Sequence, residues 1–169
     1  METAKEKGLD TTEVNYVDGE IKYSKGDYED ARSIFQKCIE DSDDAYIQMR
    51  SYIMEAKCID KQDDSVDGKK RKMKLLKKAK KELPKENNIG ILEELAQTYS
   101  DLGNDTGDTE YYQKAISVFK QIQSQGMGDY NTGYNMSVLY QNLNDYSSAE
   151  QELMQLLDNY GEDYKTYKS

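Results

Sequence analysis

Residues 15–40, NYVDGEIKYSKGDYEDARSIFQKCIE, carry the pattern that decides the fold. In the second half of this stretch, apolar side chains recur at the spacings of one face of an α-helix. They are Ala31, Ile34, Phe35, Cys38 and Ile39. Before them stands the turn GDY, whose glycine and aspartate are typical of the end of one helix and the beginning of the next. The stretch therefore predicts two helices joined by a tight turn.

The same pattern returns further along the chain. Its apolar stripes are Tyr112, Ala115, Ile116, Phe119 and Ile122, and then Tyr146, Ala149, Leu153, Leu156 and Leu157. A turn rich in glycine, asparagine or aspartate precedes each stripe. One helix–turn–helix unit that recurs at a period of roughly 34 to 41 residues is typical of a solenoid of stacked hairpins. No single hairpin can bury its own stripe, so the sequence predicts an array.

The residues at these positions resemble those of the tetratricopeptide repeat (TPR) family. The matching positions are Gly19, Ala31 and Phe35, then Leu95, Ala96, Tyr99 and Gly103, then Met136, Ser137, Tyr140, Asn144, Tyr146, Ala149 and Leu153. The resemblance implies an all-α, right-handed superhelical solenoid of four hairpins. Their approximate bounds are 12–45, 46–86, 89–129 and 130–163. Residues 1–11 would form an N-terminal extension, and residues 164–169 would begin a further helix or a cap.

Small residues explain how the two helices of a hairpin come close together. On this basis we expect Gly19 to face Ala31, Ala96 to face Ala115, and Ser137 to face Ala149. Larger aromatic side chains, among them Phe35, Phe119, Tyr99 and Tyr140, should fill the space between hairpins.

The second hairpin departs from this pattern. Lys72 stands where a small residue is expected, opposite Ile53. Either the two helices are splayed, or the lysine reaches past the contact with its charged end. The second and third hairpins are also about seven residues longer than the others, which is about one extra turn on each helix. This surplus predicts either longer helices or ordered loops at residues 61–68 and 104–110.

Composition limits the chemistry that the chain can perform. It has 169 residues, a net charge of −10, no histidine and two cysteines. Histidine is the commonest general base and metal ligand, and two cysteines cannot make a four-sulfur zinc site. Phosphate-binding, dinucleotide-binding and GxSxG motifs do not occur. We therefore expect a protein that is not an enzyme and that uses no cofactor and no metal.

One segment imitates a metal site without completing it. Residues 63–68, DDSVDG, have the oxygen ligands and the glycine that open a calcium-binding loop. The twelfth position is Lys74, where such a loop needs a bidentate glutamate. The segment is therefore interpreted as a solvated turn.

The sequence gives limited information on the compartment. Cys38 and Cys58 stand alone, which suits a reducing compartment. The first residues, METAKEKGLD, contain no apolar signal region, and no apolar run approaches the roughly 20 residues of a membrane span. Cytoplasm is the default expectation, and a domain cut from an exported or membrane-anchored protein stays open.

The resemblance also implies a binding surface, because TPR proteins line a concave groove with the first helix of each hairpin. The corresponding positions are Tyr16, Glu20, Tyr23, Arg50, Met54, Lys57, Glu93, Gln97, Asp101, Tyr134, Val138 and Asn142. Tyrosine and arginine are residue types that anchor bound peptides well. The expected partner is thus a protein or peptide, with an unused solvated groove as the alternative. The family's clamp for chaperone tails needs lysine and asparagine in the first repeat and lysine and arginine in a later one. The corresponding positions hold Tyr16, Glu20, Glu93 and Gln97, so that partner is not implied.

A basic segment gives a second interpretation. Residues 69–85, KKRKMKLLKKAKKELPK, hold ten of the 23 basic residues and one acid, so the segment carries +9 and the remainder −19. The lysines expected on its outward face are Lys70, Lys74, Lys77, Lys78 and Lys81. They could bind nucleic acid, phosphate or lipid, or they could form a solvated face that balances an acidic body. One arginine and no aromatic residue in the run argue against nucleic acid. A third interpretation is a sensory or scaffold segment of a larger signalling or envelope protein.

Overall fold

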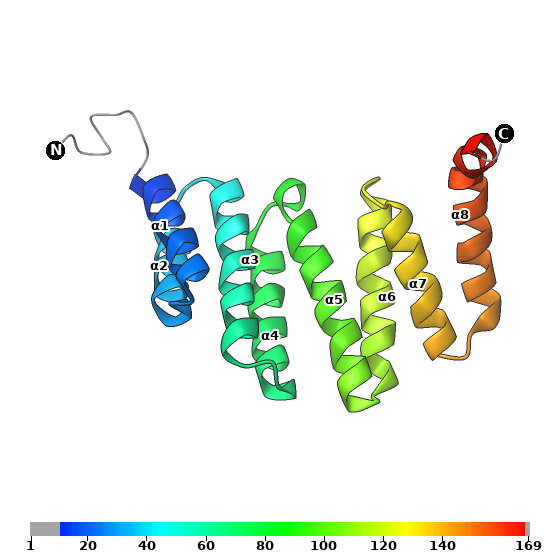
Figure 1. The fold of residues 1–169 in the computed structure, drawn as a ribbon, viewed down its shortest axis with the longest axis horizontal. Coiled ribbons are helices and arrows are strands. Elements are labelled where there is room, and N and C mark those ends of the chain that lie inside the picture. The colour runs from blue at the N-terminus through cyan, green and yellow to red at the C-terminus, as the bar shows by residue number, and fades with distance from the viewer. Residues whose placement is uncertain (1–10, 168–169) are drawn as a thin grey trace. The chain divides into compact units, whose positions relative to one another are not determined.

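A computed structural model describes the backbone of residues 11–167 and the side chains of residues 11–161. In this part of the chain there are eight α-helices, one short 3-10 helix and no β-strand, so the predicted all-α fold is confirmed. The elements are α1 (Thr11–Lys25), α2 (Tyr28–Asp41), α3 (Ala45–Gln62), α4 (Val66–Glu82), η1 (Lys85–Asn87), α5 (Ile89–Thr106), α6 (Thr109–Ser124), α7 (Tyr130–Asn142) and α8 (Tyr146–Tyr167) (Figure 1).

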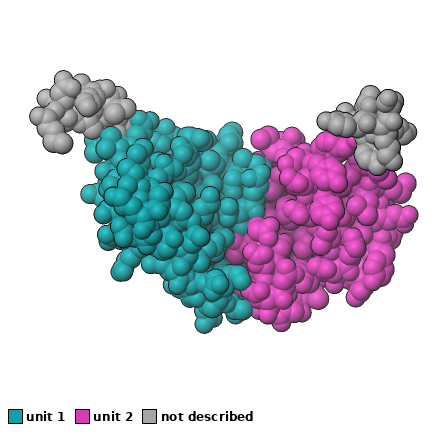
Figure 2. Space-filling view, viewed as in Figure 1, with its two compact units in different colours: residues 1–94 teal, residues 95–169 magenta. Residues whose placement is uncertain are grey.

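The chain divides into two compact units at Glu94, within α5 (Figure 2). In the first unit α1 packs on α2, α2 on α3, and α3 on α4. In the second unit α6 packs on α7 and α7 on α8. Within each unit these helices therefore contact their neighbours in chain order, which is how helical-repeat proteins bury the apolar stripe of each hairpin.

Phe35 is at the centre of the first unit's core. Its ring is fully buried and lies 5.5 Å from the ring of Tyr16. A Cβ atom at Gly19 would lie only 2.7 Å from Phe35 Cε1 and 3.2 Å from Ile34 Cγ2. The Phe35 ring therefore occupies the space that the glycine leaves, and a side chain at Gly19 would collide with Phe35 and Ile34 of α2.

The small residues of the other hairpins are also at close contacts. Those expected at helix crossings are all buried: Ala31, Ala96, Ala115, Ser137 and Ala149. In the second unit, a Cβ atom at Gly103 would lie 2.6 Å from Tyr112 Cε1. Within both units, small residues thus mark places where helices approach closely.

Lys72 is buried in the second hairpin with its charge paired. The residue is 5% exposed, and its Nζ lies 2.6 Å from Asp60 Oδ2 and 3.4 Å from Glu94 Oε2. Two arrangements were expected for this hairpin: splayed helices, or a lysine side chain that extends past the contact between them. The structure shows the second arrangement. Its ammonium group lies beside two carboxylates, which offset the free-energy cost of burying an unpaired charge.

The extra residues of the second and third hairpins lengthen their helices. α3 and α4 have 18 and 17 residues, and α5 and α6 have 18 and 16. The alternative of ordered loops at 61–68 and 104–110 is wrong, because only residues 63–65 and 107–108 separate these helices. The Ser65 hydroxyl and the Asp108 carboxylate cap α4 and α6 by accepting backbone N–H bonds from Gly68 and Glu110.

The last helix of the described chain is α8. It extends to Tyr167, so it includes residues 164–167 of the segment expected to begin a further helix or a cap. Residues 168–169, like residues 1–10 of the expected extension, lie outside the described residues. The predicted stripe of α8 is only partly buried: Leu156 is inside, whereas Leu157 is 69% exposed. α7 is the helix that packs on α8, and it covers only one side.

Two buried ionisable groups make the stability of the fold depend on pH in the alkaline range. Burial raises the pKa of the Cys58 thiol to about 11 and that of the Tyr16 hydroxyl to about 12. In an unfolded chain these pKa values are about 8.5 and about 10. As the pH rises past those values, the unfolded chain loses its protons first, so it binds fewer protons than the folded chain and stability falls.

We therefore expect these two groups to leave stability unchanged below about pH 8 and to reduce it between about pH 9 and 12. Urea unfolding followed by circular dichroism measures this. The variant Cys58→Ala should lose part of the alkaline decline. A wild-type stability that stays constant up to about pH 11 would contradict the burial of these groups.

Candidate protein-interaction surface

Arg50 is the centre of a polar and aromatic cluster on the first helices of the first unit. Its guanidinium carbon lies 4.6 Å from the Tyr16 ring centroid, on α1, and 5.6 Å from the Tyr46 ring centroid, on α3. Its Nη2 lies 3.4 Å from Glu20 Oε1. We call Tyr16, Glu20, Tyr46 and Arg50 the Arg50 cluster. α1 and α3 contact each other, which brings the four residues together.

The members of this cluster differ in exposure. Tyr16 is 6% exposed and lies beneath Arg50, so this predicted groove residue forms the floor of the cluster. The reason is that its ring packs on Phe35 in the core. The Arg50 side chain is 43% exposed and Tyr46 is 53% exposed. The guanidinium thus keeps part of its donor edge in water, because the contact with Glu20 is long and uses one of five N–H groups.

The other predicted residues of the first unit have different surroundings. Tyr23 is half-buried, with its ring 5.4 Å from the Tyr28 ring, and Met54 packs against the core. Lys57 and Glu93 are exposed. Tyr46 was not predicted as a site residue, although its spacing of four residues from Arg50 on one helix was a usable signal.

In the second unit the predicted residues lie on α5 and α7. Gln97 donates a hydrogen bond from Nε2 to Asp101 Oδ1 at 2.9 Å, within its own helix. Three exposed residues of α7 were also predicted: Tyr134, Val138 and Asn142. The ring of Tyr134 stacks on that of Tyr130 at 6.3 Å, and Tyr130 meets Tyr160 edge-on at 5.6 Å. Tyr130 was not predicted, and it extends the aromatic surface of α7.

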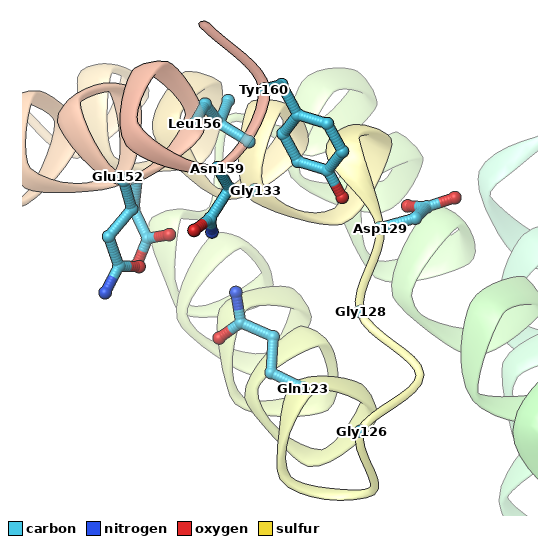
Figure 3. A pocket seen from close by; sticks show the side chains of 10 residues that line it. Gln123, Gly126, Gly128, Asp129, Gly133, Glu152, Leu156, Asn159 and Tyr160 are labelled. Atoms are coloured by element: carbon cyan, nitrogen blue, oxygen red, sulfur yellow. The ribbon is translucent and has the colours of Figure 1, made fainter. Parts of the chain in front are cut away.

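A small polar hollow also lies in the second unit, with a volume of about 220 Å³. The side-chain amides of Gln123 on α6 and Asn159 on α8 point into the same space (Figure 3). The Asp129 carboxylate points away from it and accepts a hydrogen bond from Thr132 N at 2.9 Å (Figure 3). Hydrogen bonds from backbone N–H groups lower the pKa of Asp129. Glu152 and Tyr160, both on α8, also line the hollow, so its polar groups are amides, a carboxylate and a hydroxyl.

The segment that imitates a calcium loop serves as a helix connection. Asp63 Oδ1 accepts a hydrogen bond from Ser65 N at 3.0 Å, and Asp63 Oδ2 lies 2.6 Å from Arg71 Nη2. Hydrogen bonds from the Ser65 side chain, from the Ser65 backbone N–H and from Arg71 lower the pKa of Asp63. Over the residues that the structure describes, no three Asp, Glu, Cys or His side chains form a group that could hold a metal ion. Cys38 and Cys58 are buried free thiols.

Together, the stacked helical hairpins and the exposed side chains of their first helices define a helical-repeat protein. Tetratricopeptide repeat models match residues 89–122, and also 13–40 and 134–162, together more than half of the chain. The chain belongs to the tetratricopeptide repeat family, whose repeats generally mediate protein–protein interaction or scaffolding. The hairpin α3–α4, in which Lys72 departs from the repeat pattern, lies outside the three matched segments.

Comparison with individual curated proteins and solved structures adds little to the family assignment. No curated protein matches the chain. A solved structure, described as the crystal structure of MamA protein, is 16% identical, with a TM-score of 0.39 over 92% of this chain and 94% of that one. No helix among the described residues combines the length and the apolar character needed to cross a bilayer.

Proposed function

We propose that the chain is a non-catalytic interaction module whose first unit binds a peptide or helix of a partner protein through the Arg50 cluster. The observation that carries this proposal is the guanidinium of Arg50, which lies against two tyrosine rings while part of its edge stays exposed. Membership in a family of interaction repeats supports the same class of function.

The geometry favours an oxygen acceptor on the ligand. Contact with the Tyr16 and Tyr46 rings restrains the arginine before binding, so less conformational entropy is lost when a ligand arrives. A guanidinium donates two parallel bonds to a carboxylate and single bonds to a backbone carbonyl. The exposed Tyr46 ring offers an apolar contact next to that bond. The bound segment would therefore place an acidic side chain or a carbonyl on Arg50.

Charges around the cluster would set specificity. Glu20 lies beside Arg50, and Lys57 and Glu93 are exposed in the same unit. Such charges at the edge of an interface select partners and association rates more than they add affinity.

This proposal is tested by selecting ligands and then removing the arginine. A display library of random twelve-residue peptides is selected on the full chain, and enriched peptides are titrated against variants. We expect Arg50→Ala to weaken binding by about 30-fold, since an arginine anchor contributes about 2 kcal/mol or more. The matched control is Arg71→Ala, which removes an exposed arginine from α4. It should leave the affinity unchanged.

Two results would contradict the proposal. One is a library from which no peptide is enriched on the folded chain. The other is an enriched peptide that binds Arg50→Ala and Arg71→Ala equally well, because its site would then lie elsewhere.

A further inference from the structure

Five lysines form a stripe along one face of α4. They are Lys70, Lys74, Lys77, Lys78 and Lys81, which we call the lysine stripe. At about 100° per residue their directions fall within an arc of about 100°, and the stripe is about 16 Å long. All five residues are exposed, as the sequence predicted, whereas Lys72 on another face of α4 is buried.

Nearby acids leave this stripe without counter-charges. Asp60 and Glu94 lie next to Lys72 Nζ, and Asp63 pairs with Arg71. Glu82, the acid at the end of α4, accepts a hydrogen bond from the Tyr52 hydroxyl at 2.5 Å. Among the described residues, none of the five stripe lysines has a carboxylate within 4.0 Å. The local acids thus pair with Arg71 and Lys72 of α4 and not with the stripe.

The like charges of the lysine stripe destabilise α4. Lys70 and Lys74, Lys74 and Lys78, and Lys77 and Lys81 are pairs of like charge four residues apart. Such pairs repel each other and destabilise a helix. An anionic partner that lies along the stripe would relieve this repulsion.

We propose that the lysine stripe is a second docking surface, which binds a linear acidic segment of a partner protein. It lies on α4 and uses no residue of the Arg50 cluster, so it does not depend on the function proposed above. Charge complementarity identifies the ligand class: a row of flexible ammonium groups suits successive carboxylates of an extended chain.

The width of the stripe favours a segment over a membrane. Outside residues 69–85 the chain carries −19. Asp67 is exposed in the first turn of α4, and Asp64 and Glu86 are exposed just beyond its two ends. A flat anionic membrane would approach these acids as well, within a Debye length of about 8 to 10 Å. A narrow segment that runs from Lys70 to Lys81 can follow the lysines without extending over Asp67, which lies on the same side of α4 but about one turn before Lys70.

The residue types disfavour nucleic acid as the ligand. Single-stranded nucleic acid gains affinity by stacking its bases on aromatic rings. α4 contains no aromatic residue, and Arg71, its one arginine, is paired with Asp63. Carboxylates of a peptide need only the charges that the stripe supplies.

The test uses the full chain and a fluorescein-labelled peptide of twelve glutamates, followed by anisotropy at low salt. One variant replaces four stripe lysines: Lys74→Gln, Lys77→Gln, Lys78→Gln and Lys81→Gln. The matched control replaces four exposed lysines elsewhere: Lys25→Gln, Lys37→Gln, Lys61→Gln and Lys120→Gln. Both variants change the net charge by the same amount. Circular dichroism checks that both stay folded.

We expect the stripe variant to bind the glutamate peptide at least about tenfold more weakly than the wild type, and the control less than about threefold more weakly. Raising the salt should weaken wild-type binding steeply. The stripe variant should melt no lower than the wild type, because like-charge repulsion is removed.

Three results would overturn the proposal. The first is no binding of the peptide at low salt, and the second is equal weakening in both variants. The third is tighter wild-type binding to phosphatidylserine-containing vesicles or to a twelve-nucleotide oligouridine than to the peptide, since the ligand would then be a membrane or a nucleic acid.

Discussion

Replacing Phe35 with alanine is expected to lower the free energy of unfolding by about 3–5 kcal/mol. The ring is fully buried, lies tilted against the Tyr16 ring and fills the space beside Gly19. Its removal would leave a cavity between α1 and α2 that the surrounding helices can close only in part. Because domains of this size have total stabilities of about 5–15 kcal/mol, the loss is a large fraction of the total.

Urea unfolding followed by circular dichroism measures this effect. Tyr146→Ala is a matched control, since it also replaces an aromatic residue with alanine but at a position that is largely exposed. It should cost about 1 kcal/mol or less. Equal losses in the two variants would show that Phe35 is not a core residue.

The second large effect is expected at Lys72. Lys72→Ala should lower the free energy of unfolding by about 2 kcal/mol, because it removes the buried stem of the side chain and leaves Asp60 and Glu94 without their shared cation. The loss stays below that of a fully buried pair, since both carboxylates are partly hydrated.

Lys78→Ala provides the control for Lys72, because it makes the same change on the exposed side of the same helix. Its effect should be within about 0.5 kcal/mol of zero. If the two alanine variants unfolded at the same urea concentration, the ion pairs of Lys72 would contribute nothing to stability.

Much of the fold could be predicted because it follows from local patterns. The helical spacing of Ala31 and Phe35 depends on the helix period alone, and both residues are buried as the stripe requires. The contact between Gly19 and Phe35 was not predicted, because side-chain size and helix rotation together decide which residue fills the space. The carboxylates that meet Lys72 come from other helices, so spacing along its own helix could not identify them.

The candidate site was predictable only as a set of positions. Family register placed Arg50 on the first-helix surface, but it could not show that Tyr16 is covered by Arg50 and packs inward. A tyrosine serves equally well in a core and at an interface. The apolar stripe of α8 gives a second example. Periodicity identifies its apolar face, but it cannot tell whether a neighbouring helix covers Leu157, which is exposed.

The central claim is that a partner segment lies on the first helices at Arg50. Its most direct test is the nuclear magnetic resonance spectrum of ¹⁵N-labelled protein during titration with a peptide selected on the full chain. The account predicts that the largest amide shifts occur at Glu20, Tyr46 and Arg50. Shifts concentrated on α2, around Gln36 and Lys37, with Arg50 unchanged, would contradict it.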